Sequence, residues 1–445
     1  MARYIRNISY FCIMKRLYAF LLIYSLILPF TDTVVAQDTG KGQHISAHTA
    51  IDDVMAAADG KCATQTTAND GRFEAMQFSL ITCSPHDEVY SLYGHSALRV
   101  KDEARGEDTV INYGIFSFSK PFFVLRFVFG LTDYEVWPVP YYLFISEYQR
   151  HGCRVTEQVL NLRAEEKEKL YNALAENCLP ENRVYRYNFV YDNCTTRVRD
   201  MVCQNTEGKV EFMTSVPDNT TLRSLTHEMT QGHPWARLGN DMLLGIGADR
   251  QMDKMQMQFL PQKMSEAFDS AYICRDEVKA PLVISKSTLF DGNETENSEA
   301  TLFTPMMAAV LIFLLTAVMT AVEWKRKMYF WWFDGILETA VGLAGIVITA
   351  MLFSQHPTVN ANILILLFNP LPLCFGIQAI AHRNKKQKHW LWKTEMIMLC
   401  LMIVLYSFGV QYIDPAVLLT AVALLMRCAV NSVAANEVEN KKHDA

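Results

Sequence analysis

Long apolar segments alternate with short polar loops over the last third of the chain. They lie near 303–322, 329–353, 360–381, 390–411 and 414–434. Each is close to the ~20 residues that a helix needs to cross a bilayer. Asn369-Pro370 and Pro372 interrupt the third segment, so we expect that helix to be kinked or broken. The pattern predicts an all-α transmembrane bundle over 301–436, followed by a tail at 437–445.

The amino terminus has the pattern of an export signal. Basic residues precede an apolar run from Leu17 to Phe30, and small residues suited to cleavage follow near Ala36. This predicts a signal peptide over 1–36, with an uncleaved anchor helix as the alternative. Residues 37–72 are rich in Ala, Thr, Asp and Gly and are interpreted as a linker segment.

Positive charge is distributed unevenly among the loops of the predicted bundle. Lys325-Arg326-Lys327 follows the first span, and basic residues recur at 383–393, whereas loops 354–360 and 411–415 contain no Lys or Arg. Because basic loops stay in the cytoplasm, the domain before the bundle must lie outside. The export signal independently predicts the same topology.

Mixed periodicities between 73 and 284 predict an α+β domain. Alternating residues indicate strands at 78–83, 95–101, 109–115 and 185–191. Helical spacing at 160–176 predicts a helix, and a second helix is predicted to begin at Cys194. Polar residues at 285–300 are interpreted as a linker to the first span.

The composition excludes only a few classes of function. The net charge of -6 argues against a nucleic-acid partner. Seven cysteines in the exported part permit up to three disulfides and one free thiol. The histidines show no metal-ligand spacing and no Gly-rich phosphate loop is present, so we expect no metal and no cofactor.

Cys194 is the strongest candidate for chemistry. Asp192-Asn193 precedes it as a predicted helix cap, which places the thiol at a helix amino terminus. A thiol there can have its pKa lowered from about 8.5 to roughly 3.5–7.5. The alternative is that Cys194 forms a disulfide, with Cys178 or Cys203.

His95, in the run Ser-Leu-Tyr-Gly-His-Ser-Ala-Leu-Arg-Val (91–100), is the best-framed histidine upstream of that cysteine. A thiol paired with an imidazole suggests covalent acyl chemistry. A satisfied core histidine is the alternative interpretation.

Two segments carry a family resemblance. Residues 83–100, Cys-Ser-Pro-His-Asp-Glu-Val-Tyr-Ser-Leu-Tyr-Gly-His-Ser-Ala-Leu-Arg-Val, and 185–197, Tyr-Arg-Tyr-Asn-Phe-Val-Tyr-Asp-Asn-Cys-Thr-Thr-Arg, resemble the Lnb family of membrane-anchored lipoprotein N-acyltransferases from Bacteroides-type bacteria. The second segment is also similar to lecithin:retinol acyltransferase and other permuted NlpC-type enzymes. The resemblance implies a permuted papain-like domain at the periplasmic face of a bacterial inner membrane.

The resemblance also implies a reaction. Cys194 attacks a phospholipid acyl donor to form a thioester, with His95 accepting the thiol proton. The acyl chain then passes to the α-amino group of a diacylglyceryl lipoprotein acceptor. In permuted papain-like enzymes the third catalytic group comes from the strand after the histidine strand. Asn112 is the best candidate there, and a solvent-facing strand Asn is the alternative.

Further residues are candidates for substrate binding. Tyr93, Ser96, Tyr191 and Asn193 flank the two motifs, with packing and helix capping as the alternative roles. Phe122 and Phe123 belong to an aromatic stretch at 116–144 that suits either a lipid-facing rim or core packing. The backbone N–H of Cys194 is a natural oxyanion donor.

Two other functions compete with the acyltransferase. An NlpC-type cysteine hydrolase acting on cell-wall peptides or lipids needs the same Cys194–His95 pair but no five spans. A non-catalytic envelope protein that retains the fold as a scaffold would have no need of both residues.

Overall fold

The computed structural model describes residues 71–86, 91–116, 121–276, 278–292, 302–385 and 387–433. The predicted signal peptide, almost all of the linker segment 37–72 and the tail at 437–445 lie outside these residues.

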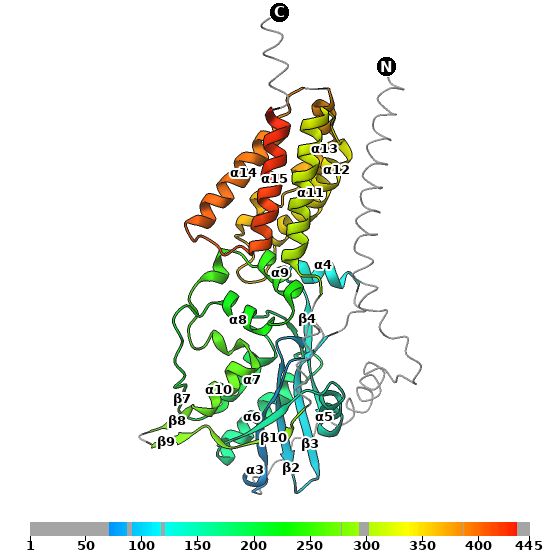
Figure 1. Cartoon of the computed structure of the whole chain (residues 1–445). Helices are drawn as coiled ribbons and strands as arrows, with labels where there is room; N and C mark the ends of the chain where they lie inside the picture. Colours follow the sequence, from blue (N-terminus) through cyan, green and yellow to red (C-terminus); the bar gives the residue numbers. More distant parts are fainter. Residues whose placement is uncertain are drawn as a thin grey trace, which may run out of the picture. The chain divides into compact units, whose positions relative to one another are not determined.

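The exported domain is built on a seven-stranded antiparallel sheet with the order β10-β5-β1-β2-β3-β4-β6 (Figure 1). Its strands are β1 (Gln77–Cys83), β2 (His95–Asp102), β3 (Glu107–Ile115), β4 (Asp133–Pro140), β5 (Val155–Leu160), β6 (Val184–Arg186) and β10 (Val283–Phe290). A second sheet joins β7 (Lys209–Glu211), β8 (Tyr272–Arg275) and β9 (Val278–Pro281). The predicted strands at 78–83, 95–101 and 109–115 are confirmed.

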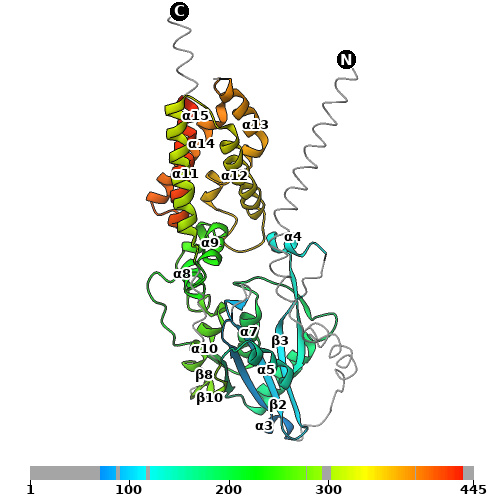
Figure 2. The same cartoon turned by 45° about the vertical axis from the view of Figure 1, so that its right-hand side comes forward.

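Helices cover both faces of the large sheet. The helices of the exported domain are α3 (Arg72–Ala75), α4 (Phe123–Val128), α5 (Tyr141–Arg150), α6 (Ala164–Asn177), α7 (Cys194–Asn205), α8 (Leu222–Met229), α9 (Pro234–Leu243) and α10 (Pro261–Asp269), with 3₁₀ turns η2 (Ile246–Asp249) and η3 (Met257–Phe259). Of these, α6, α7 and α10 cover one face of the sheet and α5 covers the other. Alternation along β1 sends Phe78 and Leu80 to a core shared with α6, α7 and α10, while Ile81 and Cys83 pack with α5. The site helix α7 is therefore held against a buried sheet (Figure 2).

Three of the predicted elements differ in the structure. The expected helix at 160–176 begins only at Ala164, because Val155–Leu160 is the strand β5. The strand expected at 185–191 ends at Arg186, since Asn188 and Asp192 exchange backbone hydrogen bonds and turn the chain. The linker expected at 285–300 begins with the edge strand β10, whose mostly exposed polar residues resemble a loop in sequence.

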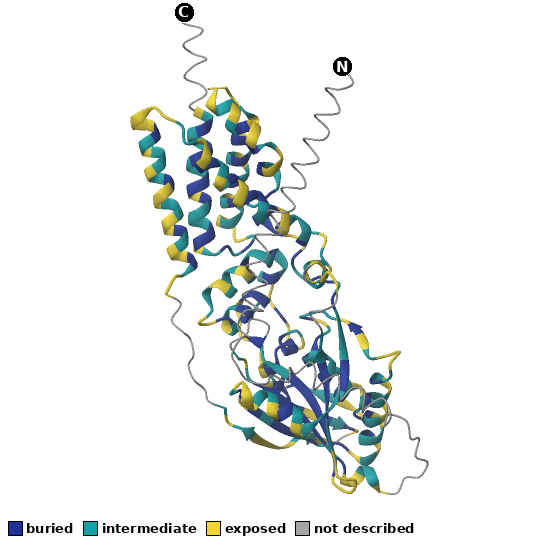
Figure 3. Ribbon diagram, turned by 90° about the vertical axis from the view of Figure 1, so that its right-hand side faces the viewer, coloured by how far each residue is buried: buried dark blue, intermediate teal, exposed yellow. Residues whose placement is uncertain are grey.

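Five helical segments have the length and apolar composition of membrane spans, as predicted. They are α11 (Pro305–Arg326), α12 (Trp331–Met351), the pair η4 (Ile363–Leu366) and α13 (Leu371–Asn384), α14 (Trp390–Ser407) and α15 (Pro415–Val433). The third span is broken before Pro370, where Asn369 Oδ1 accepts the N–H of Leu371 at 3.1 Å. Exposed residues line the outer surfaces of these helices (Figure 3), which is the arrangement expected for contact with lipid.

Backbone hydrogen bonds connect the exported domain to the loops between spans. Gly245 N donates to Thr358 O, and Ile246 N donates to Ala361 O, both at 2.8 Å. Gln355 N donates to Phe129 O at 3.0 Å. These bonds hold the end of α9 and the end of α4 to the loop that follows α12.

Candidate active site

Asn193 forms the amino-terminal cap of α7. Its Oδ1 accepts the N–H groups of Thr195 and Thr196 at 2.9 and 2.8 Å, and its Nδ2 donates to the carbonyls of Phe189 and Phe259. All of these partners belong to the protein, and the residue is buried. Asn193 therefore has the capping role named as the alternative and fixes Cys194 as the first residue of the helix, while its contact with substrate stays a prediction.

Cys194 carries a free thiol that is partly exposed. Burial is the largest influence on this thiol and on its own raises the pKa. The charge of His95, a side-chain hydrogen bond with His95 and a backbone hydrogen bond with Ser96 outweigh burial and lower the pKa to about 7 from the ordinary 9.0. A thiolate is consequently available near neutral pH.

His95 is oriented by Asn112, the residue predicted as the third group. Nε2 of His95 lies 2.9 Å from Asn112 Oδ1, and the same oxygen accepts the N–H of Gly114 at 2.9 Å. Because the Gly114 N–H requires an oxygen at this position, Nε2 must carry a proton and donate it. Nδ1 of His95 is then left for exchange with Cys194.

The thiol and imidazole affect each other's ionisation. Burial works against a protonated His95, but the Cys194 thiolate and hydrogen bonds to Cys194 and Asn112 raise the pKa of the imidazole above its ordinary 6.5. The depressed thiol and elevated imidazole pKa values are those of a thiolate–imidazolium pair.

An irregularity in the sheet creates room for this arrangement. The pairing of β3 with β4 shifts between Asn112, opposite Trp137, and Ile115, opposite Glu135. Gly114 lies within this shift, and a Cβ atom placed on it would lie 2.6 Å from Cε1 of His95. Bulges of this kind re-aim side chains next to functional sites.

Aromatic side chains surround the imidazole and the thiol. The ring of Tyr148 on α5 is parallel to that of His95, with centroids 6.1 Å apart, and Phe144 lies at 6.3 Å. The rings of Tyr134 and Tyr187 stack with their centroids 4.0 Å apart. Burial raises the pKa of both hydroxyls, and the charge of Cys194 adds to this effect. No local motif links α5 or a strand glycine to the histidine, so Tyr148 and Gly114 were not predictable from the sequence as site residues.

Three further residues predicted to bind substrate, Ser96, Tyr93 and Tyr191, differ in their contacts and exposure. Ser96 is fully buried between β2 and α7 and accepts a hydrogen bond from Thr195 Oγ1 at 3.4 Å, so it supports the site rather than contacting solvent. Tyr93 directs its hydroxyl to Asn240 Nδ2, 2.9 Å away on α9. Tyr191, three residues before Cys194, is exposed, and its contact with substrate stays a prediction.

The aromatic stretch at 116–144 is divided between core and surface. Trp137 and Phe144 are buried, whereas Phe122 is 79 % exposed and occupies a left-handed backbone conformation with φ 58°. Phe123 stacks against Phe116 with centroids 6.1 Å apart. The exposed part includes α4, where Leu125 and Phe127 are also exposed, and the hydrogen bond from Gln355 to Phe129 ties the end of this helix to the bundle.

A histidine between two spans links the bundle to the segment that precedes Cys194. Nε2 of His356 bonds to the carbonyl of Phe127 at 2.7 Å, and its ring lies 5.9 Å from that of Phe189. The Phe189 carbonyl in turn accepts from Asn193. The site is thus connected through two residues to a loop that joins membrane spans.

Among the residues that the structure describes, Cys203 and the possible metal ligands are the candidates for a competing site. Cys203 on the same helix is also a free thiol, and burial raises its pKa to about 12. Cys194 is in no disulfide, so the alternative of a bridge with Cys178 or Cys203 is wrong. Within the described ranges no group of three or more His, Cys, Asp or Glu residues is placed to hold a metal ion.

Fold and site together define a multi-pass membrane protein with a periplasmic α+β domain that carries a Cys–His–Asn cluster. The chain belongs to the Lnb family: the family model for the Lnb N-terminal periplasmic domain matches residues 64–228, and that for the Lnb transmembrane domain matches 296–438. Comparisons with curated proteins and with solved structures gave no match.

Proposed function

We propose that this protein is a lipoprotein N-acyltransferase that moves an acyl chain from a membrane phospholipid to the amino-terminal amine of a diacylated lipoprotein. The observation that carries the proposal is a thiol of pKa about 7 beside His95, in a domain hydrogen-bonded to the loops of a membrane bundle. The inferred resemblance to N-acyltransferases in the two motifs supports the same reaction.

The first half-reaction uses the thiolate–imidazolium pair. Sγ of Cys194 attacks the ester carbonyl carbon of the phospholipid, the S–C bond forms and the C–O bond breaks. His95 Nδ1 transfers its proton to the departing oxygen, so that a lysophospholipid leaves and a neutral imidazole remains. The backbone N–H of Cys194, at the start of α7, is the expected donor to the developing oxyanion.

The second half-reaction restores the pair. The neutral amine of the lipoprotein attacks the thioester carbonyl, the C–N bond forms and the C–S bond breaks. His95 accepts the amine proton at Nδ1, and Cys194 leaves as the thiolate. Asn112 keeps Nε2 protonated throughout, which reserves Nδ1 for both transfers.

Contact with the membrane is part of the proposed mechanism. Both substrates are lipids, and an active site tethered at the bilayer surface meets them at high local concentration and in a restricted orientation. The exposed Phe122 at the start of α4 and the exposed Tyr191 are the proposed lipid contacts nearest to the described site.

The test is the intact mass of a reporter lipoprotein in bacterial cells that lack their own N-acyltransferase. We expect the parent chain to add one acyl chain to the reporter's terminal amine, and the Cys194→Ser variant to add none. If neither chain changes the mass, the transferase proposal is wrong and the hydrolase becomes the better candidate. If both chains change it, Cys194 is not the nucleophile.

A further inference from the structure

The interior of the membrane bundle contains more acidic than basic groups. Four carboxyl groups are buried in its described residues: Glu323, Asp334, Glu338 and Glu395. Arg427, with no exposed surface, is the guanidinium buried with them. Charged groups in a membrane interior are costly and must be paired or neutralised.

Arg427 forms ion pairs with two of the four carboxylates. It donates to Glu323 Oε2 at 2.9 Å and to Asp334 Oδ1 at 2.7 Å, and Asn431 Nδ2 donates to the other oxygen of Asp334 at 2.7 Å. This network joins α11, α12 and α15. It leaves Glu338 and Glu395 without a basic partner among the described residues.

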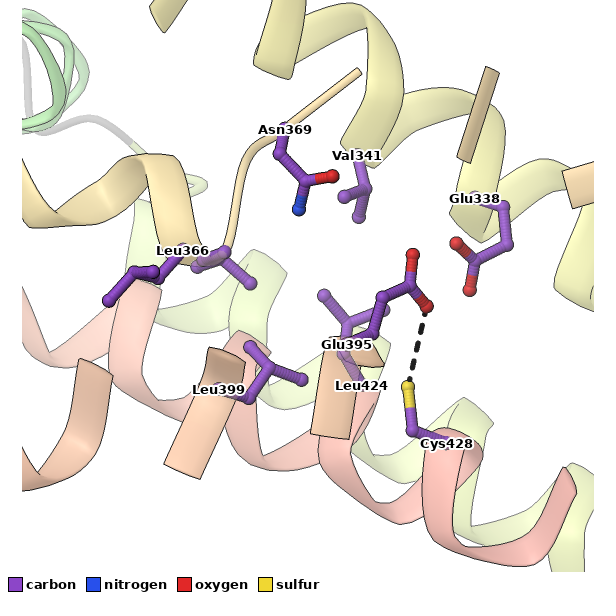
Figure 4. A pocket seen from close by; sticks show the side chains of 9 residues that line it. Glu338, Val341, Leu366, Asn369, Glu395, Leu399, Leu424 and Cys428 are labelled. Carbon is purple, nitrogen blue, oxygen red and sulfur yellow. Dashed lines mark hydrogen bonds between the residues drawn. The ribbon is translucent and has the colours of Figure 1, made fainter. Parts of the chain in front are cut away.

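Glu338 and Glu395 face each other across a small cavity (Figure 4). Their carboxyl groups are within hydrogen-bonding reach of each other, and the cavity has room for about one water molecule. Cys428 donates its thiol to Glu395 Oε2 at 3.6 Å, while Oε1 of Glu395 is buried with no hydrogen-bond donor among the described residues. Asn369, at the break in the third span, lines the same cavity.

We propose that Glu338 and Glu395 form a proton-binding site inside the membrane bundle, in which the two carboxyl groups hold one proton between them. Two adjacent carboxylates in a medium of low dielectric constant cannot both be ionised without a compensating charge. The charged and titratable neighbours are Asp334, Arg427 and Cys428, and Arg427 is already neutralised by Asp334 and Glu323. A shared proton also supplies the donor that Oε1 of Glu395 lacks.

The residues on the periplasmic side of the cavity differ from those on its cytoplasmic side. Val341 and Leu399 follow the two glutamates toward the periplasmic ends of α12 and α14, and Leu424 precedes Cys428 on the periplasmic side of α15. On the cytoplasmic side, Asp334 lies one turn before Glu338. Asn369 is the other polar residue of the lining, and its side-chain oxygen already accepts the N–H of Leu371. We infer that the proton exchanges with the cytoplasmic face.

A polar connection leads from Asp334 to the cytoplasmic loop. The hydroxyl of Tyr329, which precedes α12, donates to Asp334 Oδ2 at 3.0 Å. Changing pH on the cytoplasmic face alone should consequently change the occupancy of the pair.

Infrared spectroscopy of the full chain in sodium-free lipid nanodiscs tests for the proton. A protonated carboxyl group gives a carbonyl band that is resolved from carboxylate bands. At pH 7 we expect one such band per chain, lost in the double variant Glu338→Gln/Glu395→Gln and retained in the control Glu103→Gln, an exposed periplasmic carboxylate. Its absence from the parent chain, or its survival in the double variant, would overturn the proposal.

A second measurement needs no variant and so does not depend on the folding of one. Dicyclohexylcarbodiimide reacts with protonated carboxyl groups in apolar surroundings, and peptide mass mapping locates the adduct. We expect labelling at Glu338 or Glu395, responding to external pH in inverted vesicles and not in right-side-out vesicles. Labelling at neither residue contradicts the shared proton, and a response only in right-side-out vesicles contradicts the cytoplasmic exchange.

Added sodium distinguishes a proton from a small cation. If the pair holds a proton, 100-fold changes in sodium concentration leave the carbonyl band and the labelling unchanged. Loss of both upon adding sodium at constant pH would instead identify a cation site. None of these readouts involves acyl transfer, so the outcome is independent of the proposed function.

Discussion

The side-chain oxygen of Asn112 lies 2.9 Å from Nε2 of His95, one strand away in the sheet. The N–H of Gly114 bonds to the same oxygen at 2.9 Å, which fixes the orientation of the amide. Two donors on one acceptor determine the tautomer of the imidazole, and this tautomer leaves Nδ1 for Cys194. The order of histidine strand before cysteine helix is the permuted papain-like layout that the sequence motifs suggested.

The first prediction concerns this hydrogen bond. Asn112→Ala removes the acceptor, so the imidazole is free to rotate and to change tautomer. We expect acyl transfer to a diacylated reporter lipopeptide in vesicles to fall by about 10²-fold. Asn112→Asp, which keeps an acceptor in place, should retain most of the rate. Equal rates for the Ala variant and the parent would show that Asn112 does not orient His95.

The second prediction follows from the pKa of Cys194. Alkylation by iodoacetamide requires the thiolate, so its rate at Cys194 should rise with pH and reach half its maximum near pH 7. Arg197 and Arg199 lie between Cys194 and Cys203, which lets trypsin separate the two thiols for mass mapping. Cys203, whose pKa is about 12, is the internal control and should stay almost unmodified at neutral pH.

The third prediction gives the sign of the effect of His95 on that titration. Burial raises the pKa of Cys194, and His95 is the main influence that lowers it. In His95→Ala the burial and the hydrogen bonds with Ser96 and Thr195 remain but the largest lowering influence is lost, so the midpoint of alkylation should move upward from about 7. A midpoint that stays near 7 would show that the helix amino terminus and the Ser96 backbone stabilise the thiolate without His95.

The segment around Cys194 shows how much could be predicted from the sequence. Asn193-Cys194 has the local signature of a capped helix start, because capping depends only on residues within one turn. The alternation at 95–101 and 109–115 likewise predicts adjacent strands, which bring His95 and Asn112 together. Local pattern therefore predicted the position of Cys194 and the two strands, whereas the choice of His95 and Asn112 on those strands also needed the family resemblance.

Elements that depend on distant contacts were not predictable in this way. β10 resembles a linker in sequence, and becomes a strand only because β5 offers it a free edge. Tyr148 reaches His95 because α5 packs across the sheet, and no sequence motif connects the two. The role of Gly114 depends on a register shift in the pairing of β3 with β4. No strand was predicted from the sequence at the position of β4.

The fourth prediction concerns this glycine. A Cβ atom at residue 114 would lie 2.6 Å from Cε1 of His95, so Gly114→Ala must displace the imidazole. We expect acyl transfer to fall by about 10²-fold, and the Cys194 titration to shift upward as the pair separates. Gly239→Ala, where no atom lies within 4 Å of the new Cβ, is the matched control and should leave both unchanged. An unaltered rate in Gly114→Ala would mean that the site tolerates a displaced ring.

The last prediction separates chemistry from contact with the membrane. Gly245 N bonds to Thr358 O, and a Cβ atom on Gly245 would lie 2.1 Å from Ala361 O, so Gly245→Ala must disturb the junction with the bundle. Because Cys194 and His95 are held by other elements, alkylation of Cys194 should keep its midpoint near pH 7. Transfer from vesicle phospholipids should fall at least about tenfold, since two lipid substrates must be positioned at the site. Gly239→Ala on the neighbouring helix again serves as the control. If alkylation and transfer fall together, the junction supports the fold of the site itself; if neither falls, the loop after α12 has no part in presenting lipid to Cys194.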